Sequence, residues 1–161
     1  MPIQVGETLP LDLKLKEAGA SGPADVTVGD VFQGKKVVLF AVPGAFTPTC
    51  SLKHLPGFVE KADAIRGKGV DEIVCLSVND AFVMGAWGDA NGAGGKVRML
   101  ADGNGDLTGA LGLELDASGF GMGKRSQRYA LVATDGKVDA LYVEDGPGLK
   151  VSSADAVLAA L

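Results

Sequence analysis

The sequence lacks any apolar stretch long enough to cross a membrane. No continuous apolar run is longer than that of residues 37–42 (VVLFAV), whereas a membrane-spanning helix needs about 18 to 20 such residues. The N-terminal segment MPIQVGE contains no basic residue and no apolar segment, so we expect no secretory signal. We therefore expect a cytoplasmic protein that does not bind membranes.

Basic residues are fewer than acidic residues. The chain has 15 Lys and Arg against 20 Asp and Glu, a net charge of -5, and its basic residues are scattered. Binding to a phosphate backbone needs a concentrated positive surface, so nucleic acid is excluded as a ligand. No set of residues has the spacing of a metal site, and no motif indicates flavin, nicotinamide or haem. We expect no cofactor.

Cysteine is scarce as well, because the chain contains only Cys50 and Cys75. Two cysteines are too few for a disulfide framework. In a reducing compartment, one conspicuous cysteine more often serves catalysis or redox sensing. The residues around each of the two cysteines therefore decide which of them has such a role.

Glycine, by contrast, is abundant, at 24 of 161 residues, and with 47% hydrophobic content this indicates a folded chain with many tight turns. Strands are predicted where β-branched and apolar residues cluster, at residues 11–15, 37–42, 72–77, 96–100, 128–134 and 137–143. Helices are predicted at residues 50–66, 80–90, 107–111 and 153–161. Asn79 and Ser153 are the expected N-caps of two of them, and Pro56 is expected to kink the first.

The order of these elements predicts the fold. Strands that alternate with helices give parallel βαβ units, whereas the last two strands form a hairpin with a type I′ turn at Asp135 and Gly136. A βαβαβ unit followed by ββα is the plan of a thioredoxin-like α/β fold, with a central mixed β-sheet flanked by helices and an N-terminal strand extension. No linker interrupts the chain, so residues 1–161 are predicted to form a single domain.

Cys50 lies where a predicted strand gives way to a helix, in the segment VPGAFTPTC. The unpaired N–H groups and the positive dipole end at a helix start favour a thiolate. A thioredoxin-type enzyme would have a second cysteine three residues earlier, but here that residue is Thr47. A hydroxyl cannot form a disulfide, although it donates and accepts hydrogen bonds. The site is therefore suited to hold a small oxygen-containing substrate against Cys50.

The residues around Cys50 resemble the active-site signature of the peroxiredoxins, Pro-x-x-x-Thr-x-x-Cys. Four longer motifs resemble the peroxiredoxin-five, or plant type II (atypical), subfamily in its bacterial-like single-domain form: residues 42–51 (VPGAFTPTCS), 54–58 (HLPGF), 76–82 (LSVNDAF) and 123–129 (GKRSQRY). The resemblance implies a thiol peroxidase of antioxidant defence and redox homeostasis. Such an enzyme reduces hydrogen peroxide and organic hydroperoxides with a cysteine that becomes a sulfenic acid.

The resemblance also implies a role for each residue that matches the motif. Cys50 would be the peroxidatic nucleophile and Thr47 a hydroxyl partner of sulfur and peroxide. Pro43 would shield the pocket, and Arg128 would stabilise the thiolate and bind a peroxide oxygen. The residues expected to line the substrate side are Gly44, Phe46, His54 and Phe120. Phe120 could instead belong to a dimer interface, and Arg125 is interpreted as a solvated loop charge.

The sulfenic acid must then be reduced by a thiol. Some members of the subfamily have a C-terminal resolving cysteine, but Val151 stands in the matching position here. Cys75 has two interpretations, a buried structural thiol or a resolving partner, and both stay open from the sequence. We expect an external reductant, either glutathione with glutaredoxin or thioredoxin, and the resemblance implies a homodimer.

Other interpretations compete with this one. His54, one helical turn after Cys50, suggests a Cys-His hydrolase, but we expect it to shape the pocket wall or bond a nearby carbonyl. A general thiol–disulfide oxidoreductase and a redox-sensing binding protein are the alternative functions. Residues 102–106 (DGNGD) resemble the start of a calcium loop, but Leu107 replaces the required glycine, so we interpret them as a turn.

Overall fold

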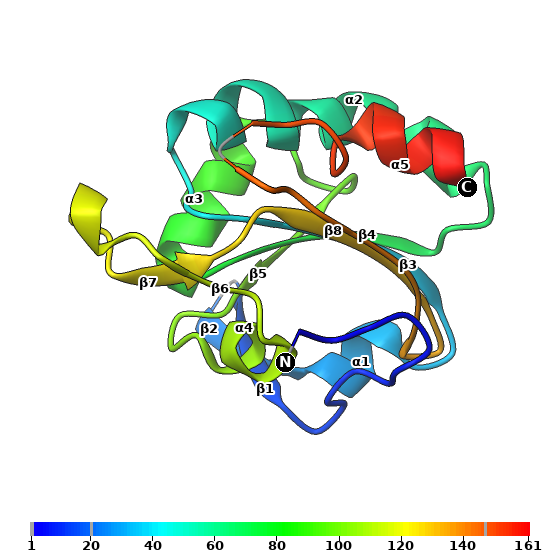
Figure 1. Cartoon of the computed structure of the whole chain (residues 1–161), viewed down its shortest axis with the longest axis horizontal. Helices are drawn as coiled ribbons and strands as arrows, with labels where there is room; N and C mark the ends of the chain where they lie inside the picture. Colours follow the sequence, from blue (N-terminus) through cyan, green and yellow to red (C-terminus); the bar gives the residue numbers. More distant parts are fainter. Residues whose placement is uncertain (1, 20, 147) are drawn as a thin grey trace.

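The computed structural model describes residues 2–19, 21–146 and 148–161, and its main feature is a seven-stranded sheet in the order β2-β1-β5-β4-β3-β8-β9 (Figure 1). Its strands are β1 Lys14–Gly19, β2 Gly22–Thr27, β3 Lys36–Val42, β4 Glu72–Ser77, β5 Arg98–Ala101, β8 Tyr129–Thr134 and β9 Lys137–Val143. A second, two-stranded sheet pairs β6 Glu114–Asp116 with β7 Lys124–Ser126. The helices are α1 Val28–Phe32, α2 Leu55–Arg66, α3 Ala81–Ala90, α4 Asp106–Leu111 and α5 Ala154–Ala160.

The pairing of the strands confirms the thioredoxin-like fold. Strand β4 lies parallel to both β3 and β5, whereas β8 runs antiparallel to β3 and β9 antiparallel to β8. The hairpin turn is confirmed as well, since Asp135 and Gly136 have φ values of 50° and 80°, as a type I′ turn requires. The sheet is therefore mixed, with the predicted βαβαβ unit at its centre.

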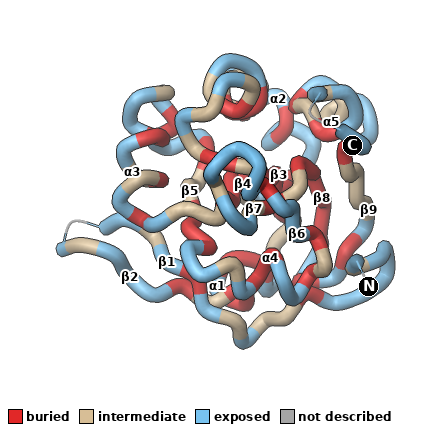
Figure 2. The backbone as a smooth tube through the Cα atoms, turned by 60° about the vertical axis from the view of Figure 1, so that its left-hand side comes forward, coloured by how far each residue is buried: buried red, intermediate tan, exposed pale blue. Residues whose placement is uncertain are grey.

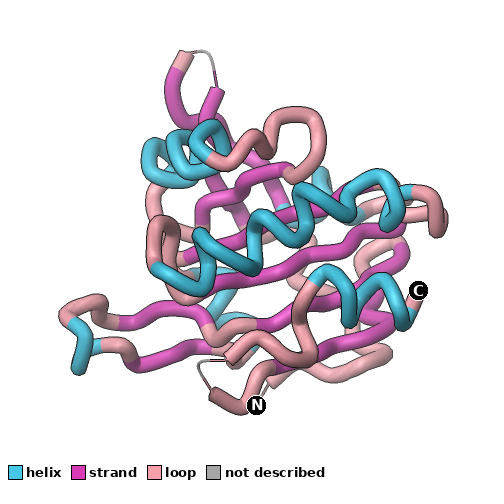
Figure 3. The backbone as a smooth tube through the Cα atoms, turned by 90° about the horizontal axis from the view of Figure 1, so that it is seen from above, coloured by secondary structure: helices cyan, strands magenta, loops and turns pink. Residues whose placement is uncertain are grey.

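Helices cover both faces of this sheet and create two hydrophobic cores. Helices α2, α3 and α5 lie on one face, while α1 and α4 lie on the other (Figure 1). Figure 3 shows α2 stretched across the strands with the shorter α5 beside it. Alternate residues of β3 point into the two cores, so that Phe40 packs under α2 while Leu39 packs toward α1. Figure 2 shows the result, with β3, β4 and β8 buried at the centre of the molecule.

The N-terminal strands and the N-cap of α3 differ from the sequence prediction. The N-terminal strand covers residues 14–19 instead of 11–15, and it pairs with β2, which the sequence pattern did not indicate because β2 is mostly exposed. The N-cap of α3 is Asp80, whose side chain accepts from the Val83 N–H, and not Asn79. The Asn79 Oδ1 instead accepts from the Ala45 N–H at 3.0 Å, so it fixes the loop before Cys50. Ser153 caps α5 as predicted.

The glycine-rich segment before Arg128 is more ordered than a simple loop. Strands β6 and β7 form a hairpin with a 3₁₀ turn, Ser118–Phe120, at its tip. Figure 1 shows this hairpin, in yellow, projecting beside α3. Among the residues that the structure describes, no helix has the length and apolar character needed to span a bilayer.

Candidate active site

Cys50 lies at the start of the helical segment that follows β3. The chain leaves β3 at Val42, passes through a short loop, and enters a helix that covers residues 48–66. Residues Cys50–His54 form a π-helical turn, in which the Leu55 N–H donates to the Cys50 carbonyl. Pro56 has no N–H to donate to the carbonyl four residues before it, so the irregularity expected at Pro56 takes the form of this π turn.

The Cys50 sulfur is paired with a guanidinium. Nη2 of Arg128 donates to Sγ at 3.0 Å, and both residues are buried. Arg128 comes directly before β8, whose Tyr129 pairs with Ala41 of β3, so two neighbouring strands bring the arginine to the cysteine. A charge-assisted hydrogen bond in a site shielded from water stabilises sulfur as a thiolate.

His54 holds the other side of the same guanidinium. Nη1 of Arg128 donates to Nδ1 of His54 at 2.8 Å, and Nε2 of His54 donates to the Ser152 carbonyl at 2.8 Å. A guanidinium can only donate and a carbonyl can only accept, so these partners fix the neutral tautomer with its proton on Nε2. The prediction that His54 bonds a nearby carbonyl is confirmed. Its Nδ1 lone pair is occupied, so the ring cannot act as a base for Cys50, which contradicts the hydrolase interpretation.

The position of His54 predicts a pH dependence of stability. Burial, and secondarily the charge of Arg128, lower the pKa of His54 to about 3. Because the folded pKa is depressed, the unfolded chain takes up a proton below pH 6.5 that the folded chain does not. The free energy of unfolding should therefore fall by about 1.4 kcal/mol per pH unit from this group between pH 6.5 and pH 3.

Urea unfolding of the wild type and of His54→Gln at pH 7.5 and pH 5 measures this effect. The wild type should lose about 2 kcal/mol more than the variant over that interval, since carboxylate contributions are common to both. Equal losses in the two proteins would show that His54 is protonated normally in the folded state.

Thr47 and Gly44 shape the loop between β3 and the helix. The Thr47 hydroxyl donates to the Gly44 carbonyl at 2.6 Å, which leaves the oxygen lone pairs of Thr47 available to accept a hydrogen bond. A Cβ on Gly44 would lie 3.1 Å from both Met122 Cε and Thr47 Cγ2, so this position favours glycine. Pro43, half-buried, joins Gly44 to the end of β3.

The two aromatic residues expected at the pocket lie in different places. Phe46 is 56% exposed, adopts a left-handed φ of 61° and has its ring centroid 6.4 Å from that of Trp87. A large side chain rarely adopts this backbone conformation. Where strained residues of this kind do occur, they cluster at functional sites. Phe120 is 86% exposed at the tip of the β6–β7 hairpin, and therefore does not join the buried cluster around Cys50.

Arg125 differs from its interpretation as a solvated charge. It is partly buried, and its Nε donates to the Met122 carbonyl at 2.9 Å. Its Nη1 lies 3.2 Å from the position of a Cβ built on Gly44. The β6–β7 hairpin thus packs Arg125 and Met122 against the loop before Cys50, although Arg128 alone among these arginines bonds the sulfur.

Cys75 is fully buried in the middle of β4, beside Phe40 of β3. Burial raises the pKa of the Cys75 thiol well above its ordinary value, and the neighbouring Cys50 adds to this effect. A thiol must ionise and reach its target in order to attack a sulfenic acid. The geometry therefore favours the structural interpretation of Cys75.

A second part of the site was missed by the sequence analysis. Glu144 and Ser152, which support His54, both lie in the connection between β9 and α5. Neither stands in a motif, and Ser152 is 98 residues from His54 in the chain. Only the fold brings them together.

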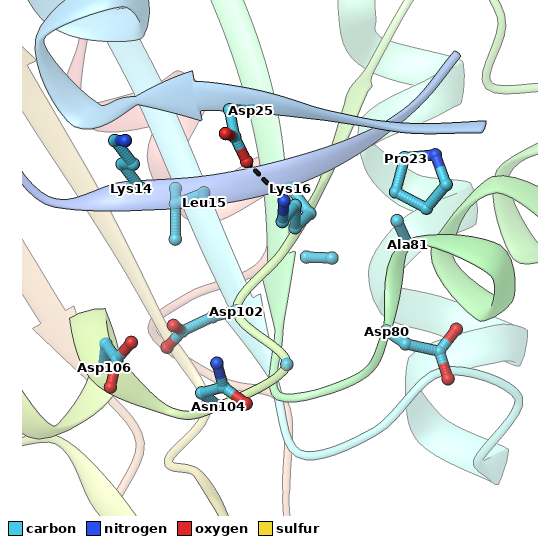
Figure 4. Close-up of a pocket in the computed structure, with 12 residues that line it drawn as sticks. Lys14, Leu15, Lys16, Pro23, Asp25, Asp80, Ala81, Asp102, Asn104 and Asp106 are labelled. Carbon is cyan, nitrogen blue, oxygen red and sulfur yellow. Dashed lines mark hydrogen bonds and ion pairs between the residues drawn. The ribbon is translucent and has the colours of Figure 1, made fainter. Parts of the chain in front are cut away.

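A cavity of about 520 Å³ lies away from Cys50, between the β1–β2 hairpin and the start of α4, and Figure 4 shows its lining. Three of the polar groups in its lining, Asp102 and the pair of Lys16 and Asp25, bond other parts of the protein. Asp102 accepts from the Leu107 and Thr108 N–H groups and from the Thr108 hydroxyl, so it caps α4, and Lys16 pairs with Asp25. The segment that resembles a calcium loop is thus a turn, as predicted, and its Asp102 bonds the first N–H groups of α4.

The chain is similar to known proteins in sequence and in fold. A family model described as Redoxin matches residues 4–158. The chain is 51% identical over 162 residues to Peroxiredoxin-2E, chloroplastic, of Arabidopsis thaliana, which covers 99% of this chain and 69% of that protein. It is similar to the structure of reduced Prx3 in complex with hydrogen peroxide from Vibrio vulnificus, with a TM-score of 0.93, 52% identity and 98% of each chain covered. Peroxiredoxin 5 from Alvinella pompejana matches with a TM-score of 0.86 and 38% identity over 98% of this chain and 97% of that one.

Proposed function

The chain belongs to the peroxiredoxins, which are thiol-dependent peroxidases, and we propose that its Cys50 reduces hydrogen peroxide and organic hydroperoxides. Its relatives include members of the peroxiredoxin-five and plant type II kind. The observation that carries the proposal is the 3.0 Å hydrogen bond from Arg128 to the Cys50 sulfur in a buried site. The peroxide-bound relative from Vibrio vulnificus supports the same substrate class.

The reaction at Cys50 is a displacement on oxygen. The thiolate attacks the terminal hydroperoxide oxygen, an S–O bond forms, and the O–O bond breaks. The leaving oxygen takes a proton and departs as water or an alcohol. Sulfur is oxidised to a sulfenic acid by two electrons, and the peroxide is reduced by the same two.

Arg128 and Thr47 contribute binding and charge stabilisation. The guanidinium of Arg128 is a fixed donor beside the sulfur, where negative charge moves from sulfur to the leaving oxygen. The Thr47 hydroxyl donates its hydrogen bond to the Gly44 carbonyl, so its oxygen is oriented to accept a hydrogen bond from the hydroperoxide O–H. Holding the O–O bond in line with sulfur supplies acceleration beyond what ionising the thiol provides.

Regeneration of Cys50 requires a thiol from outside the chain. Val151 stands in the position that matches the C-terminal resolving cysteine of some subfamily members, and Cys75 is buried with a raised pKa. A thiol would therefore condense with the sulfenic acid to release water and form a mixed disulfide, which a second thiol reduces. We assign this role to glutathione with glutaredoxin, or to thioredoxin.

Steady-state turnover of tert-butyl hydroperoxide tests the assignment. Wild type and Cys75→Ala should turn over at the same rate when glutathione and glutaredoxin, or thioredoxin and its reductase, are supplied. The rate should depend on which of the two reducing systems is present. Turnover that disappears in Cys75→Ala, while that variant remains folded, would contradict external resolution.

The proposal includes a homodimer. Phe46 and Phe82, 56% and 70% exposed, are large apolar side chains on the loop before Cys50 and on α3, and Phe46 contacts Trp87 of the same helix. A second copy of the chain would cover such side chains. Sedimentation velocity separates a dimer from a 16.3 kDa monomer, and a monomer at micromolar concentration would contradict this part.

A further inference from the structure

Glu144 is a buried carboxylate that the peroxidase reaction does not itself require. It follows β9 directly and is 7% exposed. Its Oε2 accepts from the N–H groups of Lys150, Val151 and Ser152 at 2.9, 2.8 and 2.8 Å, and from the Ser152 hydroxyl at 2.7 Å. Burial alone would raise the pKa of Glu144, but these hydrogen bonds outweigh it and lower the pKa, so the carboxylate is charged.

The contacts of Glu144 form a closed circuit that begins and ends at Arg128. The Glu144 N–H donates to the Arg128 carbonyl at 2.9 Å. The Glu144 carboxylate holds Ser152, whose carbonyl accepts from His54 Nε2. His54 in turn accepts from Nη1 of Arg128, whose Nη2 bonds the Cys50 sulfur. Glu144 therefore contacts the backbone of Arg128 directly and its guanidinium through two intermediates.

We propose that Glu144 is a positioning residue for the peroxidase reaction, which fixes the Arg128 guanidinium against Cys50 through Ser152 and His54. The inference rests on the proposed function of Cys50. An arginine side chain has several rotatable bonds, so its donors stay aimed at the sulfur only when other groups restrain them. The orientation of the His54 ring depends on the Ser152 carbonyl, and three successive N–H groups place that carbonyl by bonding Glu144.

A purely structural role would be different. Glu144 would then anchor the connection to α5, and its loss would reduce stability without altering the reaction rate of the folded protein. The two roles are separated by the rate constant for Cys50 oxidation, because His54 lies between Glu144 and Arg128. Removing His54 should also remove any effect of Glu144 on that rate.

The experiment measures the second-order rate constant of Cys50 oxidation by tert-butyl hydroperoxide in reduced, folded protein. Glu144→Gln keeps the shape but loses the charge, and should slow oxidation about tenfold to hundredfold, as a small misplacement of a catalytic group does. Asp145→Asn makes the same chemical change at the next residue, which is exposed, and should stay within about twofold of wild type. In a His54→Gln background, Glu144→Gln should add less than about threefold.

The rate constants decide whether Glu144 positions Arg128. Unchanged oxidation in folded Glu144→Gln, or an equal slowing with and without His54, would overturn the positioning role. If Glu144→Gln does not fold, Glu144→Asp, which keeps the charge but withdraws it by one methylene, is measured in the same two backgrounds. Failure of the proposed function would appear separately, as a wild type whose Cys50 is not oxidised at all.

Discussion

Serine in place of Cys50 should leave the protein unable to consume tert-butyl hydroperoxide, whereas alanine in place of Cys75 should leave consumption unchanged. The expected loss is complete, because a serine hydroxyl is a weak nucleophile toward peroxide oxygen and cannot supply the two electrons that the Cys50 sulfur gives to the peroxide. Cys75 lies in the centre of β4 with its thiol buried and its pKa raised. It should not react on the same timescale.

The measurement is the decay of one equivalent of hydroperoxide after mixing with reduced protein. Alanine is chosen for Cys75, since serine would bury a hydroxyl between Phe40 and Met99, its neighbours on the adjacent strands. Circular dichroism checks that each variant is folded. If Cys50→Ser reacts as fast as the wild type, the peroxidase reaction does not occur at Cys50.

The second large effect is expected at Arg128. Arg128→Met should lower the rate constant for peroxide by about 10³-fold, which is the scale for losing a donor that stabilises developing charge. Loss of thiolate alone cannot account for so much, since an ordinary thiol is already about 3% ionised at pH 7 and full ionisation gains about thirtyfold. The rest reflects the lost hydrogen bonds to the peroxide.

Two comparisons make this prediction specific. Arg128→Lys keeps a positive charge but loses the planar guanidinium, whose two terminal nitrogens bond Cys50 and His54 at the same time. Iodoacetamide should alkylate Cys50 faster in Arg128→Lys than in Arg128→Met, whereas the reaction of Cys50 with peroxide should remain slow in both variants. Arg125→Met removes the arginine that bonds Met122 instead of sulfur, and should change the peroxide rate by less than about threefold. Equal effects of the Arg125 and Arg128 substitutions would contradict the assigned geometry.

Much of this site could be predicted because its signals are local in the chain. The strand of residues 36–42 is apolar on both faces, and the next strand repeats this pattern. Pro43, Thr47 and Cys50 lie within eight consecutive residues of the segment between these strands. The position of Arg128 directly before β8 also followed, since the hairpin pattern placed Arg128 at the start of the predicted strand of residues 128–134. The cytoplasmic location stays a prediction.

The support behind Arg128 could not be predicted, because it depends on contacts between distant segments. His54 meets Arg128 and Ser152 at sequence separations of 74 and 98 residues, and nothing in its own neighbourhood indicates either partner. The hairpin of β6 and β7 was also missed, since its short strands are mostly exposed and rich in glycine connections. Exposed pairing leaves little hydrophobic periodicity to detect.

The central claim is that Cys50, and not Cys75, receives the peroxide oxygen. One equivalent of tert-butyl hydroperoxide is added to the reduced wild type in the presence of dimedone, which traps sulfenic acids, and the digest is analysed by mass spectrometry. Trypsin separates the two cysteines into residues 37–53 and 69–96. The account predicts one dimedone adduct on the peptide with Cys50, an unmodified Cys75 and one equivalent of tert-butanol. An adduct on Cys75, a disulfide between the two peptides, or unconsumed hydroperoxide would contradict it.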